Sequence, residues 1–180
     1  MSTSWRKHAS ERIGDFAVFS LRRDVVESPR TSARLSVYVL EAPAWVNVVP
    51  VTPAGDMVLI EQFRHGIETP CLEIPGGMVD GAESPAEAAA RELFEETGYR
   101  AEALHPLGVS HPNPAILNNV LHSYVATGAR RVAEPRLDSS EDISVVIYPL
   151  ERVQELVRDG RITHALVLAA FHFLSLRRNG

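Results

Sequence analysis

The sequence has little cysteine and contains no long hydrophobic run. Cys71 is the single cysteine among 180 residues, so an intrachain disulfide and a zinc site built on several cysteines are both excluded. Nothing approaches the roughly 20 consecutive apolar residues that cross a bilayer, and residues 1–14 hold no apolar signal segment. These absences predict a soluble, cytoplasmic protein that does not enter a membrane.

An excess of basic residues is also missing. Lys and Arg total 18 against 23 Asp and Glu, a formal net charge of −5. Proteins that hold nucleic acid by its phosphates carry a basic face, so no nucleic-acid partner is expected. A small anionic substrate is still compatible, because bound metal ions can supply local positive charge.

The apolar residues that are present form short runs typical of an α/β protein. With 45% hydrophobic residues the chain can build one sizeable core, and it is too short for two ordinary domains. Helices are expected at 84–97, 150–159 and 163–176, so that helices cover a sheet in one α/β/α unit. Strands are expected at 16–21, 35–40, 46–51, 57–63, 101–109, 120–126 and 143–148.

The segment 84–97 carries clear helix signals. Ser84 suits the N-cap, Pro85 the first helical position, and Glu87 completes a capping box. Gly98 stands where a helix usually ends. A stripe about 100° wide is expected to face the core and consists of Ala86, Ala90, Leu93, Phe94 and Thr97.

Three carboxylates are expected away from that stripe. Glu92 and Glu96 lie about 40° apart on the helical wheel, and Glu95 about 60° beyond Glu92. Crowded carboxylates repel unless water or a cation neutralises them, and oxygen ligands favour Mg²⁺ or Mn²⁺ over zinc. Taken alone, the cluster is either a solvated surface with Arg91 as partial counterion or a metal site.

The surrounding residues favour the metal site. Gly77, five residues, Glu83, seven residues and the stretch from Arg91 to Tyr99 (REXXEE-type, here RELFEETGY) stand at fixed spacing. This pattern resembles a complete Nudix box, and such a long match is highly specific. The resemblance implies a Nudix-type α/β/α sandwich with a mixed β-sheet and hydrolysis assisted by Mg²⁺, with Mn²⁺ as the alternative.

The resemblance assigns metal-binding roles residue by residue. Glu92 and Glu96 become the principal ligands, and Glu95 a further ligand or a contact to metal-bound water. The Gly76 carbonyl becomes a backbone ligand in a tight loop, and Glu141 matches a loop glutamate that binds metal or acts as base.

Two catalytic roles follow from the same resemblance. Arg91 is expected to orient the carboxylates by pairing with Glu83 or Glu95, which its forked guanidinium suits. The proton of the attacking water goes to Glu141 or to a box glutamate, Glu95 or Glu96, and the sequence leaves these alternatives open.

Further stretches resemble the branch that hydrolyses ADP-ribose and other nucleoside-diphosphate sugars. They are residues 58–64 with 72–77, Pro114, and 141–143 with 160–162. On this resemblance Arg64 is a candidate phosphate contact and Pro114 part of the substrate-binding region. Glu73 is either a ribose contact or a satisfied carboxylate at a strand end.

One segment departs from that branch. Many ADP-ribose enzymes carry Gly-Phe-Ser followed closely by an acidic residue, whereas residues 112–119 here read PNPAILNN. This weakens an assignment to ADP-ribose itself and leaves other nucleoside-diphosphate sugars open. Asn118 and Asn119 are then candidate substrate contacts, or they form a turn before a strand.

The predicted reaction is attack of a metal-activated water on one phosphorus, which releases a nucleoside monophosphate and a sugar phosphate. Alternatives are a dinucleotide or nucleoside-triphosphate pyrophosphohydrolase, or a non-catalytic nucleotide-sugar-sensing module, which the intact glutamates disfavour. The branch usually pairs through N-terminal strands. Residues 1–43 are therefore expected to be a dimer-forming strand extension of a 44–180 hydrolase domain, giving a homodimer.

Overall fold

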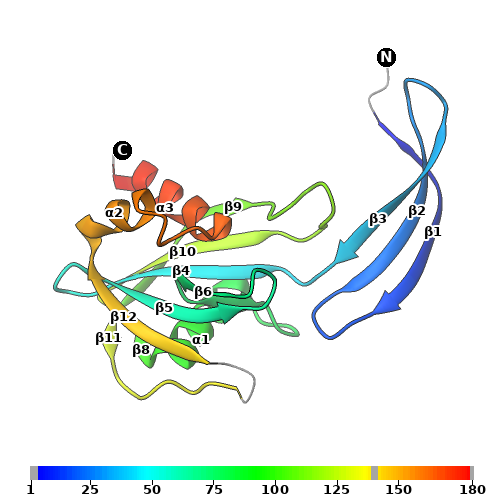
Figure 1. Ribbon diagram of the computed structural model, residues 1–180. Coiled ribbons are helices and arrows are strands. Elements are labelled where there is room, and N and C mark those ends of the chain that lie inside the picture. The colour runs from blue at the N-terminus through cyan, green and yellow to red at the C-terminus, as the bar shows by residue number, and fades with distance from the viewer. Residues whose placement is uncertain (1–3, 139–141, 179–180) are drawn as a thin grey trace. The chain divides into compact units, whose positions relative to one another are not determined.

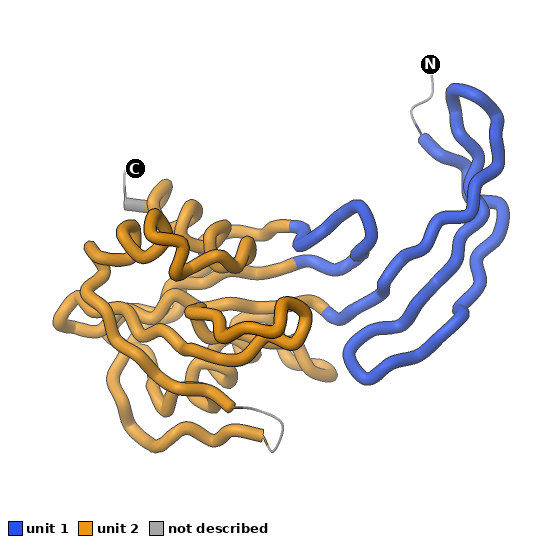
Figure 2. Tube along the Cα trace, viewed as in Figure 1, with its two compact units in different colours: residues 1–43, 111–120 blue, residues 44–110, 121–180 orange. Residues whose placement is uncertain are grey.

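The computed structural model describes residues 4–138 and 142–178, and the chain divides into two compact units. Unit 1 consists of residues 1–43 and 111–120, and unit 2 of residues 44–110 and 121–180 (Figure 2). Unit 1 therefore combines the N-terminal segment with residues 111–120, a short segment that lies between two parts of unit 2 in the sequence.

Unit 2 is built on a mixed β-sheet. In the part of the chain that is described, its strands lie in the order β12-β5-β4-β10-β9, with β6 on β5 and β7 on β4 (Figure 1). The two central strands, β4 and β10, run parallel, and the other pairs are antiparallel. The bounds are β4 Trp45–Val51, β5 Asp56–Arg64, β6 Thr69–Glu73, β7 Gly76–Met78, β9 Ala103–Ser110, β10 Leu121–Thr127 and β12 Ile143–Pro149.

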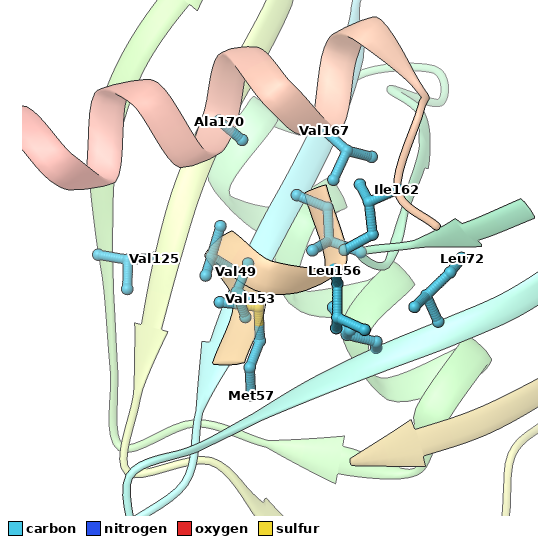
Figure 3. Close-up of a cluster of buried hydrophobic side chains, with 11 residues drawn as sticks. Val49, Met57, Leu72, Val125, Val153, Leu156, Ile162, Val167 and Ala170 are labelled. Carbon is cyan, nitrogen blue, oxygen red and sulfur yellow. The ribbon is translucent and has the colours of Figure 1, made fainter. Parts of the chain in front are cut away.

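Helices cover both faces of this sheet. Successive side chains of β4 point to opposite faces, so each face contributes to a different hydrophobic cluster. Val46 and Val48 pack on α1, Pro85–Thr97. Val49 faces the opposite way, toward α2, Val153–Arg158, and α3, Ala165–Arg178 (Figure 3). The predicted α/β/α sandwich with a mixed sheet is confirmed. None of the helices in the described ranges is long and apolar enough to cross a membrane.

Shorter elements complete unit 2. The 3₁₀ turn Leu150–Arg152 leads into α2, where the sequence predicts one continuous helix. After α1, the two-residue strand β8, Tyr99–Arg100, pairs with β11, Arg130–Arg131. This pairing ties the chain beyond β10 to the end of α1.

The ends of α1 form as the sequence predicts. Ser84 Oγ accepts the backbone N–H of Glu87 at 3.3 Å, and the Glu87 carboxylate accepts the backbone N–H of Ser84 at 2.7 Å. Gly98 closes the helix with a φ of 73°, in the left-handed region that glycine tolerates.

The predicted core stripe of α1 is partly wrong. Ala86 and Ala90 are exposed and Phe94 is half-buried. The buried face extends to the glutamate side of the helix, because β7 lies against Glu92 and Glu96. The buried residues are Ala88, Ala89, Leu93, Glu96 and Thr97.

Unit 1 is a three-stranded antiparallel sheet with one added segment. Its strands are β1, Arg6–Asp15, β2, Ser20–Glu27, and β3, Arg34–Glu41, in the order β1-β2-β3. The segment 111–120 adds to β3, since the Leu40 N–H donates to the Ile116 carbonyl at 2.8 Å.

The strand predicted at 16–21 is wrong over residues 16–19, and only its last two residues belong to a strand. The Phe16 N–H donates to the Phe19 carbonyl at 2.9 Å in a turn between β1 and β2, and β2 begins at Ser20. β1 carries mostly exposed polar residues, so it has no apolar alternation by which a sequence pattern could detect it.

Candidate active site

Arg91 is the centre of the carboxylate cluster on α1. Its guanidinium donates to both Glu83 oxygens, from Nη2 at 2.8 Å and from Nε at 3.2 Å. Nη1 donates to Glu92 at 2.9 Å and to Glu95 at 3.0 Å, and Nη2 donates to the Met78 carbonyl at 2.9 Å. Arg91 therefore contacts both of the partners that the sequence offered as alternatives, and Glu92 as well.

These contacts shift the protonation equilibria of the cluster. The hydrogen bond from Arg91 lowers the pKa of Glu83, and a backbone hydrogen bond from Asp80 adds to that effect. In turn, the hydrogen bond to Glu83 is the largest contribution that raises the pKa of Arg91, against the opposing effect of burial. Glu83 and Arg91 therefore stay ionised together as a pair at neutral pH.

Glu96 links α1 to β7. Its side chain is buried, with the residue 4% exposed, and its Oε2 accepts the backbone N–H of Gly76 at 2.8 Å. Glu96 was expected away from the core-facing stripe of the helix, but it is buried because β7 lies over it. Gly76 belongs to a strand opposite Asn47 and not to the tight loop that the sequence indicates.

Two glycines allow β7 to lie this close. A Cβ on Gly76 would stand 2.4 Å from the Val46 carbonyl oxygen. A Cβ on Gly77 would stand 2.3 Å from Oε1 of Glu92, so the Glu92 carboxylate occupies the space that any other residue would fill. The glutamates of α1 are thus held directly against the backbone of β7.

The donor chemistry of this cluster fits a hard divalent cation. Glu92, Glu95 and Glu96 offer carboxylate oxygens, and the Gly76 backbone adds a carbonyl oxygen, the ligand type of Mg²⁺ and Mn²⁺. Across residues 4–138 and 142–178 no three Asp, Glu, His or Cys side chains already converge as a metal cluster. In the conformation described, Arg91 supplies the positive charge beside Glu92 and Glu95.

A second ionic group connects β5, β6 and the start of α3. Glu73 is 2% exposed, and Arg64 donates to both of its oxygens, from Nε and Nη2, at 2.8 Å each. His164 Nδ1 lies 2.7 Å from Oε2 of the same carboxylate. Burial raises the pKa of Glu73, but the hydrogen bonds from Arg64 and His164 outweigh it and bring the pKa to about 2.

Arg64 and Glu73 are predicted site residues, whereas His164 is not predicted from the sequence. The structure pairs the two predicted residues with each other, which corresponds to the satisfied strand-end carboxylate that was one of the two interpretations of Glu73. Nothing in the sequence relates His164 to them, because 91 residues separate it from Glu73. The one sequence feature near His164 is the helix predicted at 163–176, which begins after Gly160.

The remaining predicted substrate contacts lie in unit 1. Asn118 Oδ1 accepts the backbone N–H of Ala42 at 3.3 Å, and Asn119 Nδ2 donates to the Pro43 carbonyl at 3.0 Å. Pro114 is exposed in the turn that begins at Asn113. The two asparagines hold the segment after β3. Glu141, the predicted loop ligand or base, lies outside the described residues.

Comparison with known proteins supports a family assignment. A model described as NUDIX domain matches residues 42–171. The chain is 31% identical to the ADP-ribose pyrophosphatase of Bacillus subtilis (strain 168), over 94% of this chain and 91% of that protein. It is 30% identical to the methanol dehydrogenase activator of Bacillus methanolicus, over 93% and 91%. A crystal structure of an ADP compounds hydrolase matches with a TM-score of 0.87 and 24% identity, over 100% of this chain and 98% of that one, and shares the fold.

Proposed function

Because the chain belongs to the NUDIX domain family, we propose that it hydrolyses the diphosphate linkage of ADP-ribose or another nucleoside-diphosphate sugar with the help of divalent cations. The family predicted from the sequence pattern between Gly77 and Tyr99 is confirmed. One observation carries the proposal: the glutamates of α1 lie against β7, with Glu96 bonded to Gly76 and Glu92 packed on Gly77.

Each part of the cluster has a role in this reaction. Glu92, Glu96 and Glu95, with the Gly76 carbonyl, hold the cations, for which we propose Mg²⁺ with Mn²⁺ as a substitute. When bound, such a cation neutralises diphosphate oxygens and lowers the pKa of the attacking water. Glu141 or a box glutamate accepts the proton of that water.

Two arginines have separate roles in the proposed site. Arg91 fixes the geometry of Glu83, Glu92 and Glu95 through its fork of N–H donors. Arg64, fixed on Glu73, presents its remaining N–H groups to a substrate phosphate. The products are a nucleoside monophosphate and a sugar phosphate.

Two observations bear on the substrate class, one in favour of ADP-ribose and one against ADP-ribose alone. One relative, identical at 31% of positions, is an ADP-ribose pyrophosphatase. The 112–119 segment lacks the acidic residue expected for ADP-ribose enzymes, so nucleoside-diphosphate sugars as a class are proposed instead of ADP-ribose alone. Dinucleotides and nucleoside triphosphates are the alternatives that a substrate panel must include.

The test is a hydrolysis assay with ADP-ribose, GDP-mannose, UDP-glucose, NADH and nucleoside triphosphates. We expect a nucleoside-diphosphate sugar to be the best substrate, with activity that requires Mg²⁺ or Mn²⁺ and is lost in excess chelator. Glu96→Gln should reduce turnover by several orders of magnitude, whereas Glu155→Gln, an exposed glutamate on α2, should not. Tight binding of a nucleotide sugar without turnover would instead indicate a sensing module.

We also propose a cytoplasmic homodimer, in which residues 1–43 form the dimerisation extension and residues 44–180 the hydrolase domain. The buried free thiol of Cys71 is compatible with a reducing compartment. Unit 1 carries exposed large apolar residues on β3, namely Leu35, Val37 and Tyr38. A second copy of the chain would bury them.

A further inference from the structure

The carboxylate of Glu73 is shared between two cationic or polar partners from distant parts of the chain. Arg64, at the end of β5, binds both oxygens, and His164, just ahead of α3, binds Oε2. We propose that His164 is a positioning residue that acts through Glu73 to hold Arg64 in the orientation that binds a substrate phosphate. This inference rests on the proposed function, since it concerns the phosphate affinity of the same site.

The geometry of Arg64 explains why its orientation matters. The guanidinium uses Nε and Nη2 on Glu73, and Nη1 has no hydrogen-bond partner among the described residues. Its side chain is 42% exposed while that of Glu73 is 2% exposed. A buried carboxylate therefore fixes one edge of the fork, and the other edge remains available for an anion.

The protonation state of the pair identifies the donor. Because the pKa of Glu73 is about 2, its carboxylate is ionised at neutral pH and can only accept hydrogen bonds. Nδ1 of His164 must therefore carry the proton in this contact, whether the ring is neutral or charged. Oε2 thus receives two donors, Nη2 of Arg64 and Nδ1 of His164.

The contribution of His164 follows from the burial of Glu73. A carboxylate removed from water needs its oxygens satisfied, and burial by itself favours the neutral acid. Without the Nδ1 donor, Oε2 would keep one protein donor, and the orientation of the Glu73 carboxylate that carries Arg64 would be less restrained. Arg64, which is partly exposed, would then sample other rotamers.

The backbone of His164 is well placed for this role. Its carbonyl accepts the N–H groups of Val167 and Leu168, at 3.0 and 3.1 Å, in the first turn of α3. In the same turn the Leu166 carbonyl accepts Nδ2 of Asn47 at 3.0 Å. Asn47 is the strand partner of Gly76, so the start of α3 is attached to the sheet beside the metal-binding strand β7.

Arg64 also responds to the charge of the glutamate helix. Its pKa is raised, first by the hydrogen bond to Glu73 and, among smaller contributions, by the negative charge of Glu96. The guanidinium that His164 helps to fix therefore lies within the electrostatic reach of the proposed metal ligands.

The experiment compares three substitutions in the full-length protein. His164→Asn places an amide N–H near the position of Nδ1, and His164→Leu removes the donor. His172→Leu, which changes an exposed histidine on α3, is the control. With the best nucleotide sugar of the panel, His164→Leu should raise KM about tenfold, the size expected for one hydrogen bond to a charged group. The kcat should change little, because such a contact binds ground and transition states alike.

His164→Asn and His172→Leu should stay within about threefold of the parent KM, a small free-energy difference. Equal defects in His164→Leu and His164→Asn, or a defect confined to kcat, would overturn the proposal. If His164→Leu does not fold, His164→Gln replaces it, since its amide reaches the Nε2 position and not the Nδ1 position.

A second readout does not depend on activity. The ¹⁵N-edited NMR signal of the Arg64 Nε–H, assigned by its loss in Arg64→Lys, should shift and broaden in His164→Leu and remain sharp in His164→Asn. An unchanged signal in His164→Leu would overturn the proposal even if KM rises. If the parent hydrolyses none of the tested nucleotides, the proposed function fails, while this signal still decides whether His164 positions Arg64.

Discussion

Consecutive glycines control how closely the carboxylates of α1 approach β7. Gly76 leaves room for the Val46 carbonyl and Gly77 leaves room for the Glu92 carboxylate, where a Cβ would stand 2.4 and 2.3 Å from the nearest oxygen. Real Cβ atoms do not approach other atoms so closely, so a larger residue at either glycine must displace the neighbouring oxygen. At Gly77 the atom displaced belongs to a proposed metal ligand.

Gly77→Ala should therefore impair metal use more than folding. The added methyl group pushes the Glu92 carboxylate away, and we expect the Mg²⁺ concentration for half-maximal activity to rise by about tenfold or more, as when metal-site geometry is disturbed. The measurement is a Mg²⁺ titration of hydrolysis with circular dichroism as a folding check. Gly66→Ala is the control, because nothing lies within 4 Å of its Cβ. Equal Mg²⁺ dependence in both variants would contradict the account.

Glu73 gives the molecule a pH-dependent stability. Its pKa is about 2 in the folded state against an ordinary value of 4.5, so its stabilising effect is complete above about pH 4.5 and is lost as the pH falls toward 2. Glu73→Gln removes this contribution. The slope of unfolding free energy between pH 5 and about pH 3 should be smaller in Glu73→Gln than in the parent, measured by urea unfolding.

Part of that slope should survive in the variant. Asp24 in unit 1 also has a pKa of about 2, because hydrogen bonds from Ser10, Lys7 and Arg22 outweigh the effect of burial. The same slope in Glu73→Gln and parent would mean that Glu73 is not the ionised anchor described above.

At the scale of elements, the C-terminal end of α1 is held by the chain that follows β11. The N–H groups of Val132 and Ala133 donate to the Gly98 carbonyl, and the Arg136 N–H donates to the Glu95 carbonyl at 2.7 Å. The Phe94 ring contacts the guanidinium groups of Arg100 and Arg136, at 4.5 and 5.2 Å from its centroid. These contacts fix the turn of α1 that carries two proposed ligands.

Gly98→Ala should loosen this end of the helix. Gly98 has a φ of 73°, and a Cβ there would stand 2.1 Å from the Ala133 carbonyl oxygen. We expect a loss of unfolding free energy of about 2 kcal/mol or more from the left-handed backbone and the collision together, measured by urea unfolding. Activity should fall as well, because Glu95 and Glu96 lie in the affected turn.

Gly160→Ala separates the two causes. Gly160 has a similar φ of 71° but nothing within 4 Å of its Cβ. Gly160→Ala should lose about 1 kcal/mol of unfolding free energy, the cost of a left-handed non-glycine residue. The activity of this variant should be retained. If both variants lost the same stability, the contact between Gly98 and Ala133 would not matter.

At the scale of the whole molecule, unit 1 exposes apolar side chains that a monomer would leave in water. Leu35 and Val37 lie two residues apart on β3, hence on one face of the sheet, and both are exposed. We predict a dimer at micromolar concentration in sedimentation velocity. The double substitution Leu35→Glu and Val37→Glu should yield monomers, because burying two carboxylates at an interface is unfavourable.

Leu176→Glu serves as the control for that experiment. Leu176 is also an exposed apolar residue, but it lies on α3 in unit 2, so this change should leave the dimer intact. A parent protein that sediments as a monomer would rule out the proposed assembly, and dissociation by Leu176→Glu would assign it to a different surface.

Much of the fold was predictable because it depends on local chemistry. Ser84, Pro85, Glu87 and Gly98 mark the ends of α1 through contacts within a few residues of each other. The apolar runs of β4 and β5 identify buried strands, since their side chains enter the core wherever their partners come from. β1 has no such run, and only its pairing with β2 makes it a strand.

The sequence by itself determined the family and the presence of the glutamate cluster on α1. The spacing from Gly77 to Tyr99 lies within one continuous stretch of chain, so it can be recognised without knowing the fold. Only the tertiary structure decided that Glu96 is buried under Gly76 and that His164 shares Glu73 with Arg64. Both contacts join segments far apart in the chain. Which distant segments meet depends on how the helices and strands pack, and no single stretch of sequence records that.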